Sequence, residues 1–449
     1  MQIVIVGAGI VGRALAEQLS IEGHQVSIID QNRRSIRELS EKLDVLAITG
    51  SGSTPSVLER AGIKTAAMVI AVTDVDEVNI VVGMLAERYG VLHKIVRIRN
   101  QEYVQEDSVL QPEDFGIDRV INPEPLIVRA LERIIEIPGC LDMASLAGGE
   151  VAILGFEIAH DSPAAGKTPA ELREVGELNA FLILYIIRND EVLVPRGGDR
   201  IEPGDKVHIL VAKDTIPFLV PIIHKHPRAT RRVIIAGAGR IGLQLAKTLE
   251  DKIDRCVVIE PDASVAEDAA NELPHATVLH GDPTDLDVLE EASVDRCDLF
   301  CALSDDDQRN MLASLVAKRH GARKAAVVVI LPQYVSVLRS LGVETVISPR
   351  LATVGEILMH VRRGYIHSVT RIAEGRAEIL ELEAPDGAPA VGKPVSKLKF
   401  PQDALIGAIV RSGFMQIPTG RTRIEAGDLV IVFALPGAIG RIEKLFSAR

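Results

Sequence analysis

The chain contains the same long pattern twice, and this internal repeat constrains its fold more than any other feature. Residues 2–19 (QIVIVGAGIVGRALAEQL) align with residues 232–249 (RVIIAGAGRIGLQLAKTL), so that Gly7 aligns with Gly237. A different pattern follows each of these segments and is also repeated. Such self-similarity in a chain of 449 residues is typical of duplicated domains. The segments therefore follow the order A–B–A′–B′, with a join near residues 226–231.

The A segments and the B segments predict different folds. Each A segment alternates short runs of Val and Ile with helical stretches, which predicts a parallel sheet covered by helices on both faces. In the B segments, Gly and Pro turn signals separate the strands, as in residues 194–205 and 417–428. The fold class is thus α/β, with two Rossmann-like N-lobes, each followed by a small α+β C-lobe. The expected domains are 1–123, 140–225, 231–348 and 368–449, with helices at 123–137 and 349–364.

Composition narrows the class of protein. Aromatic residues are 3% of the chain and Trp is absent, so the cores must consist of Val, Ile, Leu and Ala. The net charge of −12 argues against a nucleic-acid partner, because phosphate backbones select basic surfaces. No apolar run approaches the ~20 residues that span a bilayer. The scattered cysteines favour buried free thiols over a metal site, and the N-terminus leaves no room for a signal peptide. The basic residues around Lys225 and Arg231-Arg232 are interpreted as a solvated linker, with a local basic patch as the alternative.

The first glycine motif has the spacing of a dinucleotide-binding loop. It follows a strand and opens a helix, and its residues are Gly7, Ala8, Gly9, Ile10, Val11 and Gly12. The first Gly permits a tight turn, the second lets the backbone approach a pyrophosphate, and the third lets helix and strand pack closely. The helix N-terminus then offers N–H groups and a positive dipole end to phosphates. Asp30 ends the second strand, 18 residues after Gly12, and suits the ribose hydroxyls.

The second copy repeats this arrangement. Its candidate residues are Gly237, Gly239, Arg240, Ile241, Gly242 and Glu260. The acids Asp30 and Glu260 favour a free 2′-hydroxyl, so NAD(H) is preferred over NADP, and ATP or ADP is an alternative. Arg33 is close enough to accept a 2′-phosphate, although the surface of a helix is the preferred interpretation. A duplicated domain can lose its ligand, so the second site is the weaker prediction.

Small polar turns follow the next strands, at the edge where open α/β sheets bind ligands. After the third strand come Gly50 and Ser51 in the first copy and Asp282 in the second. After the fourth come Thr73 and Asp74, then Ser304 and Asp305. These groups are predicted to border an adenine or ribose, or to cap the following helix.

The fifth strand distinguishes the two copies. The sequence KIVRIRN is expected to place Arg97 and Arg99 on one face of this strand, where Arg97 can pair with a phosphate or a partner subunit. The aligned residues of the second copy are Val328 and Ile330. The first copy is therefore expected to be the better anion site.

The A segments resemble the RCK domain, also called KTN, and the B segments resemble its C-terminal subdomain. The four-module order and the third-strand turn GSGSTPSVL (50–58) resemble the tandem RCK regulatory subunits of bacterial Trk-type potassium uptake systems. The resemblance implies that NAD(H) or an adenine nucleotide contacts Gly7–Val11, Asp30, Thr73-Asp74 and Arg97, and less firmly Gly239–Gly242 and Glu260. It also implies a homo-oligomeric ring, a dimer or tetramer of tandem chains. This ring would attach peripherally to the cytoplasmic face of a membrane potassium-translocating subunit of the TrkH or TrkG type.

Two functions are compatible with duplicated Rossmann-like lobes. A regulatory sensor would change conformation when nucleotide binds and would gate a potassium pore. An NAD-dependent oxidoreductase would need a general acid or base near the nicotinamide, and the short B segments offer no such constellation of His, Lys or Tyr. The sensor is therefore preferred, and no catalytic or metal-binding residue is predicted.

Overall fold

The computed structural model describes residues 1–104, 111–175, 181–189, 191–225, 227–361, 366–372, 377–401, 403–435 and 438–447. These residues form two compact units, which are considered separately below. The first unit comprises Met1–Ile127, Ile330–Pro332 and Ser348–Leu358. The second comprises Val128–Val329, Gln333–Ile347 and Met359–Arg449. The first N-lobe thus lies in one unit, and both C-lobes and all six strands of the second N-lobe lie in the other.

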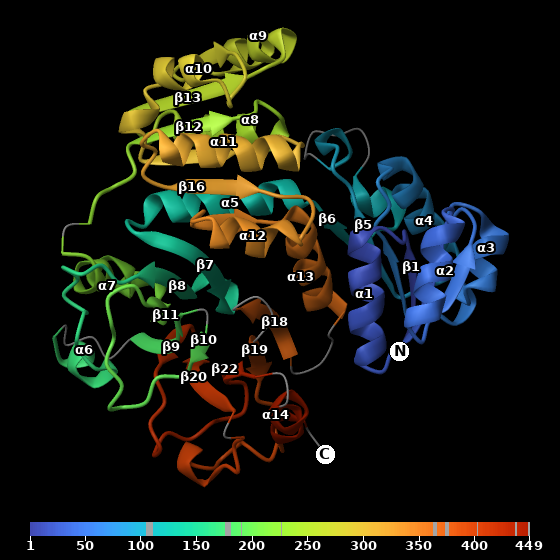
Figure 1. Cartoon of the computed structure of the whole chain (residues 1–449). Helices are drawn as coiled ribbons and strands as arrows, with labels where there is room; N and C mark the ends of the chain where they lie inside the picture. Colours follow the sequence, from blue (N-terminus) through green and yellow to red (C-terminus); the bar gives the residue numbers. More distant parts are fainter. Residues whose placement is uncertain are drawn as a thin grey trace. The chain divides into compact units, whose positions relative to one another are not determined.

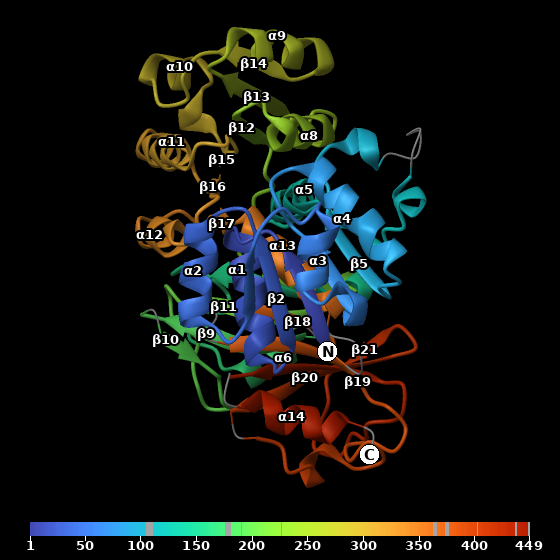
Figure 2. The same ribbon diagram turned by 90° about the vertical axis from the view of Figure 1, so that its right-hand side faces the viewer.

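The first N-lobe is built on a six-stranded parallel sheet in the order β3-β2-β1-β4-β5-β6. Helices α1 and α2 cover one face, and α3 and α4 cover the other (Figure 2). The order reverses beside β1, as in dinucleotide-binding folds. The bounds are β1 (Gln2–Val6), α1 (Ile10–Ile21), β2 (Gln25–Asp30), α2 (Arg33–Lys42), β3 (Leu46–Thr49), α3 (Pro55–Arg60), β4 (Met68–Ala71), α4 (Asp76–Arg88), β5 (His93–Arg97) and β6 (Arg119–Ile121).

The second N-lobe repeats this topology with the order β14-β13-β12-β15-β16-β17. Helices α8 and α9 lie on one face, and α10, α11 and α12 lie on the other (Figures 1 and 2). The bounds are β12 (Arg232–Ala236), α8 (Arg240–Leu249), β13 (Arg255–Glu260), α9 (Ala263–Glu272), β14 (Thr277–His280), α10 (Leu286–Glu291), β15 (Leu299–Ala302), α11 (Asp307–Arg319), β16 (Ala325–Val328), α12 (Tyr334–Ser340) and β17 (Thr345–Ile347).

Coverage of both sheet faces explains the unbroken apolar runs of the strands. Ile3, Val4 and Ile5 follow one another in β1, and none has any exposed surface. A strand with one solvated face would alternate apolar and polar residues instead. The four cysteines are buried and free, as predicted. Burial raises the pKa of the Cys256 and Cys297 thiols to about 12, which keeps both protonated and unreactive.

Each C-lobe is built on a five-stranded antiparallel sheet, in the orders β10-β9-β11-β8-β7 and β18-β19-β22-β20-β21. Side chains from both sheets, including Leu184, Leu210 and Phe433, form one shared apolar cluster. The bounds in the first C-lobe are β7 (Cys140–Leu146), β8 (Val151–Glu157), α6 (Pro169–Val175), β9 (Phe181–Arg188), β10 (Glu191–Leu193), β11 (Lys206–Ala212) and α7 (Ile216–Ile223). In the second they are β18 (Ile366–Ile372), β19 (Ala377–Glu383), β20 (Ala404–Arg411), β21 (Phe414–Gln416), β22 (Leu429–Ala434) and α14 (Ile439–Phe446).

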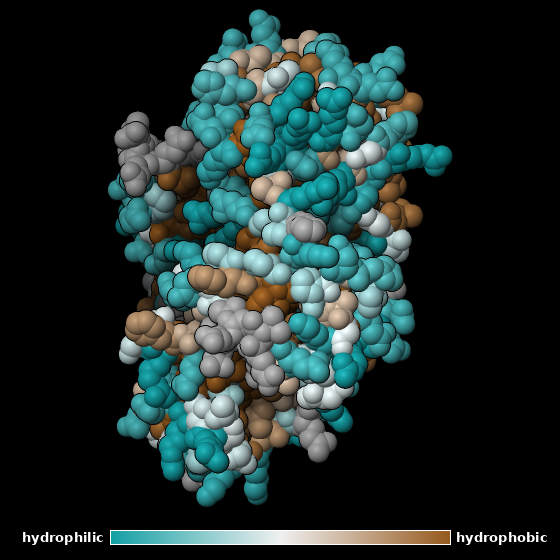
Figure 3. Space-filling model, turned by 90° about the vertical axis from the view of Figure 1, so that its left-hand side faces the viewer, coloured by the Kyte–Doolittle hydropathy of each residue, from teal (hydrophilic) through white to brown (hydrophobic). Residues whose placement is uncertain are grey.

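Two further helices follow the N-lobes. Helix α5 (Pro123–Glu136) corresponds to the expected helix at 123–137, and α13 (Pro349–Val361) to the one at 349–364, whose residues 362–364 lie outside the described residues. The segment Ser348–Leu358, which includes most of α13, belongs to the same compact unit as the first N-lobe, although it follows the second N-lobe in the sequence. Within the described part of the chain, no helix combines the length and apolarity needed to cross a bilayer. On the face drawn in Figure 3, hydrophilic side chains cover most of the surface.

An arginine–aspartate cluster holds the turn that is repeated in the C-lobes. In the first, Arg188 at the end of β9 makes two hydrogen bonds of 2.7 Å to the carboxylate of Asp205 and one of 2.7 Å to Glu202. Asp205 is 1% exposed. Arg411 repeats these contacts with Asp428 and Glu425 in the second C-lobe. In each C-lobe, the aspartate of the repeated Gly-Asp pair is therefore a buried carboxylate that accepts hydrogen bonds from an arginine.

We expect Asp205→Ala to destabilise the first C-lobe. The substitution leaves the Arg188 guanidinium without the carboxylate of Asp205. Breaking a buried ion pair costs roughly 3 kcal/mol in the free energy of unfolding. Thermal unfolding monitored by calorimetry measures the change. Glu202→Ala is the matched control, because Glu202 is 59% exposed in its pair with Arg188 and should contribute less than about 1 kcal/mol. Equal effects of the two substitutions would contradict this assignment.

Candidate functional site

The glycine motif of the first copy forms a tight turn between β1 and α1. Gly7 has φ +109°, a conformation that favours glycine, and donates its N–H to the carbonyl of Ile29 at 2.8 Å. A Cβ atom on Gly12 would lie 1.8 Å from the carbonyl oxygen of Gly7, so only glycine fits. The first and third glycines are therefore required by the folded chain itself.

Gly9 differs from its two neighbours. It has φ −70° and ψ −169°, an extended conformation that any residue can adopt, and a Cβ atom there would meet nothing within 4 Å. It lies just before α1, and no side chain caps the helix at this point. The first-turn N–H groups of a helix have no acceptor within the helix. The open space beside Gly9 is thus suited to an anionic group.

The second copy reproduces this geometry. Gly237 has φ +107°, and a Cβ atom on Gly242 would lie 1.9 Å from the Gly237 oxygen. Gly239 has open space, like Gly9. Ile10 and Val11 occupy the first turn of α1, and Arg240 and Ile241 occupy the first turn of α8, where Arg240 is exposed. The structure therefore brings together every predicted residue of both loops.

The acids at the ends of the second strands bridge two loops. Asp30 accepts hydrogen bonds from the N–H of Ala8 at 2.6 Å and of Asn32 at 2.7 Å. Glu260 accepts from Ala238 at 2.7 Å and from Asp262 at 3.0 Å. A carboxylate has about four lone-pair positions, so each acid retains acceptor capacity for ribose hydroxyls.

The third-strand turns lie beside these acids. Gly50 donates its N–H to the carbonyl of Asp30 at 2.9 Å, and the hydroxyl of Ser51 lies 2.8 Å from that of Ser53. In the second copy, Asp282 accepts from both the N–H and the hydroxyl of Thr284, and these bonds lower its pKa. Asp282 thus closes a local turn, and a ligand would compete with Thr284 for its carboxylate.

A buried asparagine, which the sequence analysis missed, organises the fourth-strand turn. Asn79 is 0% exposed and accepts hydrogen bonds from the N–H and hydroxyl of Thr73 at 3.0 and 2.7 Å. Its amide donates to the carbonyls of Thr73 and Arg97, each at 3.0 Å. It therefore ties the turn after β4 to the end of β5. The internal repeat could have indicated this residue, because Asn79 aligns with Asn310 in the second copy.

Asn310 makes the same set of contacts in the second copy. It accepts from the N–H and hydroxyl of Ser304 and donates to the carbonyls of Ser304 and Val328. Asp305 is exposed beside this turn. The helix cap expected in this region belongs to the next residue, since Asp306 accepts the N–H groups of Gln308 and Arg309.

Arg97 places a largely buried cation at the carboxyl edge of the first sheet. Its side chain is 12% exposed and lies 3.2 Å from Asp74, a carboxylate that is 83% exposed. Its Nε atom is buried and has no hydrogen-bond partner among the described residues. Burial lowers the pKa of Arg97, although an arginine stays protonated in proteins. This guanidinium therefore has capacity for a further anion.

Arg99 contacts the same aspartate as Arg97. Strand β5 ends at Arg97, so Arg99 lies two residues beyond the end of the strand. Its side chain nevertheless donates to the carbonyl of Asp74, and its Nε lies 3.9 Å from Asp76. In the second copy the position of Arg97 is held by Val328, which is 3% exposed and offers no charge.

Arg13 is a second residue that the sequence analysis missed. Its Nε donates to the carbonyl of Ala8 at 3.0 Å, and its Nη1 pairs with Glu38 at 3.1 Å. Arg13, which lies in α1, therefore connects the first glycine loop to Glu38 of α2. The aligned residue of the second copy is Leu243, so only the first loop has this support.

We expect Asn79→Ala to destabilise the first N-lobe by roughly 3 kcal/mol. The substitution leaves the N–H of Thr73 and two partly buried carbonyls without their partner, at about 1–3 kcal/mol for each unsatisfied group. Urea unfolding followed by far-UV circular dichroism measures the change. The control is Asn32→Ala, which removes an exposed helix cap worth about 1 kcal/mol. An effect of Asn79→Ala no larger than that of the control would refute the role of Asn79.

Comparisons with known proteins agree with this architecture. Residues 3–123 and 233–349 match the TrkA-N domain, and residues 153–219 and 379–447 match the TrkA-C domain. The Trk system potassium uptake protein TrkA of Azorhizobium caulinodans is 36% identical, over 99% of this chain and 98% of that protein. A TrkA homolog of Archaeoglobus fulgidus is 35% identical, over 99% of this chain and 100% of that protein.

A solved structure has the same fold at lower sequence identity. The GsuK channel bound to NAD matches with a TM-score of 0.61 and 19% identity, over 100% of this chain and 79% of that chain. The relatives of 35–36% identity match this chain from end to end, and both kinds of domain occur twice in the same order. This chain therefore belongs to the TrkA family.

Proposed function

We propose that this chain is the cytosolic, nucleotide-binding regulatory subunit of a potassium uptake system. The observation that carries the proposal is the open space beside Gly9 and Gly239, each between two glycines that the fold itself requires. At both positions the protein has space for a side chain, yet both copies have glycine. A ligand that approaches the backbone accounts for this glycine. The family relatives are named for potassium uptake, which supports the role of this ligand in transport.

The proposed ligand is NAD(H), with its pyrophosphate on the glycine loop and its ribose on Asp30 or Glu260. The GsuK channel, which shares the fold, has been solved with NAD. The first site would hold the ligand through Gly7–Gly12, Asp30, Thr73, Asp74 and Arg97. The second would use Gly237–Gly242, Glu260 and Ser304, and would bind more weakly because Val328 replaces the arginine.

Regulation then follows from differential binding. A ligand that binds two conformations with different affinities shifts their populations. The difference between the two binding free energies is the coupling free energy that links the nucleotide sites to a partner bound at the other lobes. The proposed partner is a membrane potassium-translocating subunit, to which a ring of these chains attaches at the cytosolic face. In this proposal the nucleotide is an effector, and the chain transfers no hydride.

Gly9→Ala tests this function. The added methyl group has space in the free protein, so folding and thermal stability should stay unchanged, while binding of NADH to the first site should weaken by about tenfold or more. Isothermal titration calorimetry measures the affinity. Potassium uptake by cells that express the variant with the membrane subunit should lose its response to nucleotide.

Two matched variants separate binding from folding. Gly12→Ala should destabilise the first N-lobe, because its Cβ atom has no space, whereas Gly239→Ala should affect only the second site. Wild-type NADH affinity and wild-type potassium uptake in both Gly9→Ala and Gly239→Ala would rule out nucleotide regulation through these loops.

A further inference from the structure

A basic hollow lies at the edge of the second N-lobe that is opposite its glycine loop. It is a cavity of about 180 Å³ formed where β12 and β13 begin and where the turn Val294–Arg296 precedes β15. A second hollow adjoins it, lined partly by Pro227–Ala229 and Arg231. Strand β12 separates this edge from Gly237 by five residues, or about 17 Å at 3.3 Å per residue. The hollow is therefore distinct from the candidate nucleotide site.

Positive charge predominates around these two hollows. Five arginines and two aspartates line them, whereas the whole chain has a net charge of −12. Both aspartates already have partners. Asp298 accepts the backbone N–H groups of Arg231 and Arg232 at 2.9 and 3.0 Å, and Asp254 lies 3.5 Å from the guanidinium of Arg231. The five arginines are Arg228, Arg231, Arg232, Arg255 and Arg296.

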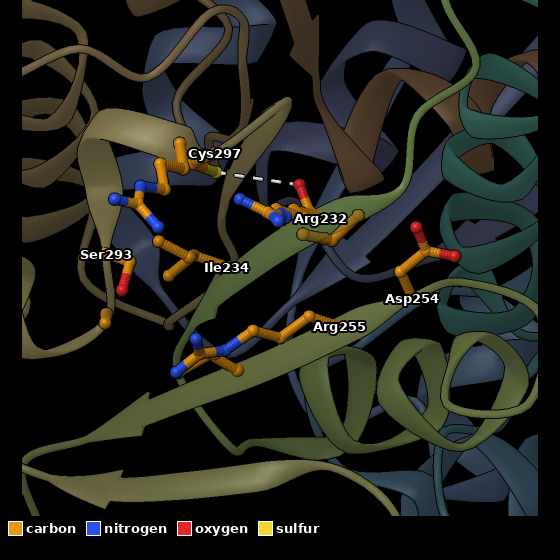
Figure 4. Close-up of a pocket in the computed structure, with 10 residues that line it drawn as sticks. Arg232, Ile234, Asp254, Arg255, Ser293 and Cys297 are labelled. Carbon is orange, nitrogen blue, oxygen red and sulfur yellow. Dashed lines mark hydrogen bonds between the residues drawn. The ribbon is translucent and has the colours of Figure 1, made fainter.

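Two of these arginines occupy directly paired positions in the sheet. Arg232 of β12 and Arg255 of β13 are register partners, and Figure 4 shows their side chains extending from neighbouring strands into the cavity. Neither has an ion pair within the described part of the chain. Both arginines are exposed at the start of their strands, so solvent screens their mutual repulsion and their guanidinium N–H groups are accessible to an anion.

The first N-lobe provides an internal comparison. Its register pair at the same position is Gln2 and Gln25, and Thr65 aligns with Arg296. Gln2 and Thr65 are hydrogen-bonded to each other at 2.6 Å, so these uncharged side chains satisfy each other. The same scaffold therefore folds without these arginines, and all three cations are specific to the second copy. Arg232 also begins a strand, which corrects its interpretation as part of a linker.

We infer that this hollow is a binding site for a compact polyanion with closely spaced phosphate groups. Planar guanidinium groups bind phosphate oxygens through paired N–H donors, and two arginines on adjacent strands present such donors side by side. The cavity has more than ten times the ~10–15 Å³ that holds one water molecule, so it accommodates a phosphate group. The phosphates can belong to a soluble polyphosphate or to the headgroup of an anionic lipid.

The double variant Arg232→Gln/Arg255→Gln tests this site, because it restores the residues with which the first copy folds. Inorganic triphosphate is titrated into the full chain by calorimetry in the presence of saturating NADH. Vesicles of cardiolipin, whose headgroup carries two phosphates, in phosphatidylcholine are tested in parallel by co-sedimentation. Wild-type chain should bind saturably in one arm, which identifies the source of the phosphates, and the double variant should lose at least tenfold in affinity in that arm.

The control is Arg37→Gln/Arg88→Gln, which removes the same number of charges from exposed helix positions and should bind like the wild type. Circular dichroism of all three proteins checks that the fold is retained. Binding that weakens equally in both double variants would show a general charge effect and would overturn the inference. Absence of saturable binding in both arms would also overturn it.

Discussion

The close approach of the Gly7 carbonyl to the α-carbon of Gly12 is the constraint on which each N-lobe depends. It brings the N-terminus of α1 against the end of β1, and Gly242 repeats it against Gly237 in α8 and β12. Because no side chain fits between these atoms, the turn is short, and the helix dipole points at the space beside the second glycine. Asp30 then fastens this loop to the end of β2 through the N–H of Ala8. The nucleotide site is thus a consequence of how strand and helix pack.

Duplication has allowed the two N-lobes to diverge at both edges of one scaffold. At the carboxyl edge the first copy has Arg97, a largely buried cation with an exposed partner, where the second has Val328. At the amino edge the second copy has Arg232 and Arg255, whereas the first has a neutral pair of glutamines. The arginines that distinguish the two lobes therefore lie at opposite ends of the strands, which suits two different anionic ligands in one regulatory chain.

Much of this architecture could be predicted from the sequence, because its signals are local. Runs of Val and Ile predicted the parallel strands, and the glycine spacing predicted the turn and helix. Asn79 could not be recognised in the same way, since its role depends on carbonyls and N–H groups that only the folded chain brings together. The position of Arg232 beside Arg255 could not be predicted either, because the pairing of β12 with β13 is not a local property. In both cases, comparison of the two copies residue by residue would have provided a signal.

We propose that the two glycine loops bind nucleotide with unequal strength, because only the first has a largely buried arginine at the end of its fifth strand. Calorimetric titration of the full chain with NADH tests it most directly, with Arg97→Ala beside the wild type. We expect two classes of sites in the wild type and selective weakening of the tighter class in the variant. A single class of equivalent sites, unchanged by Arg97→Ala, would contradict it.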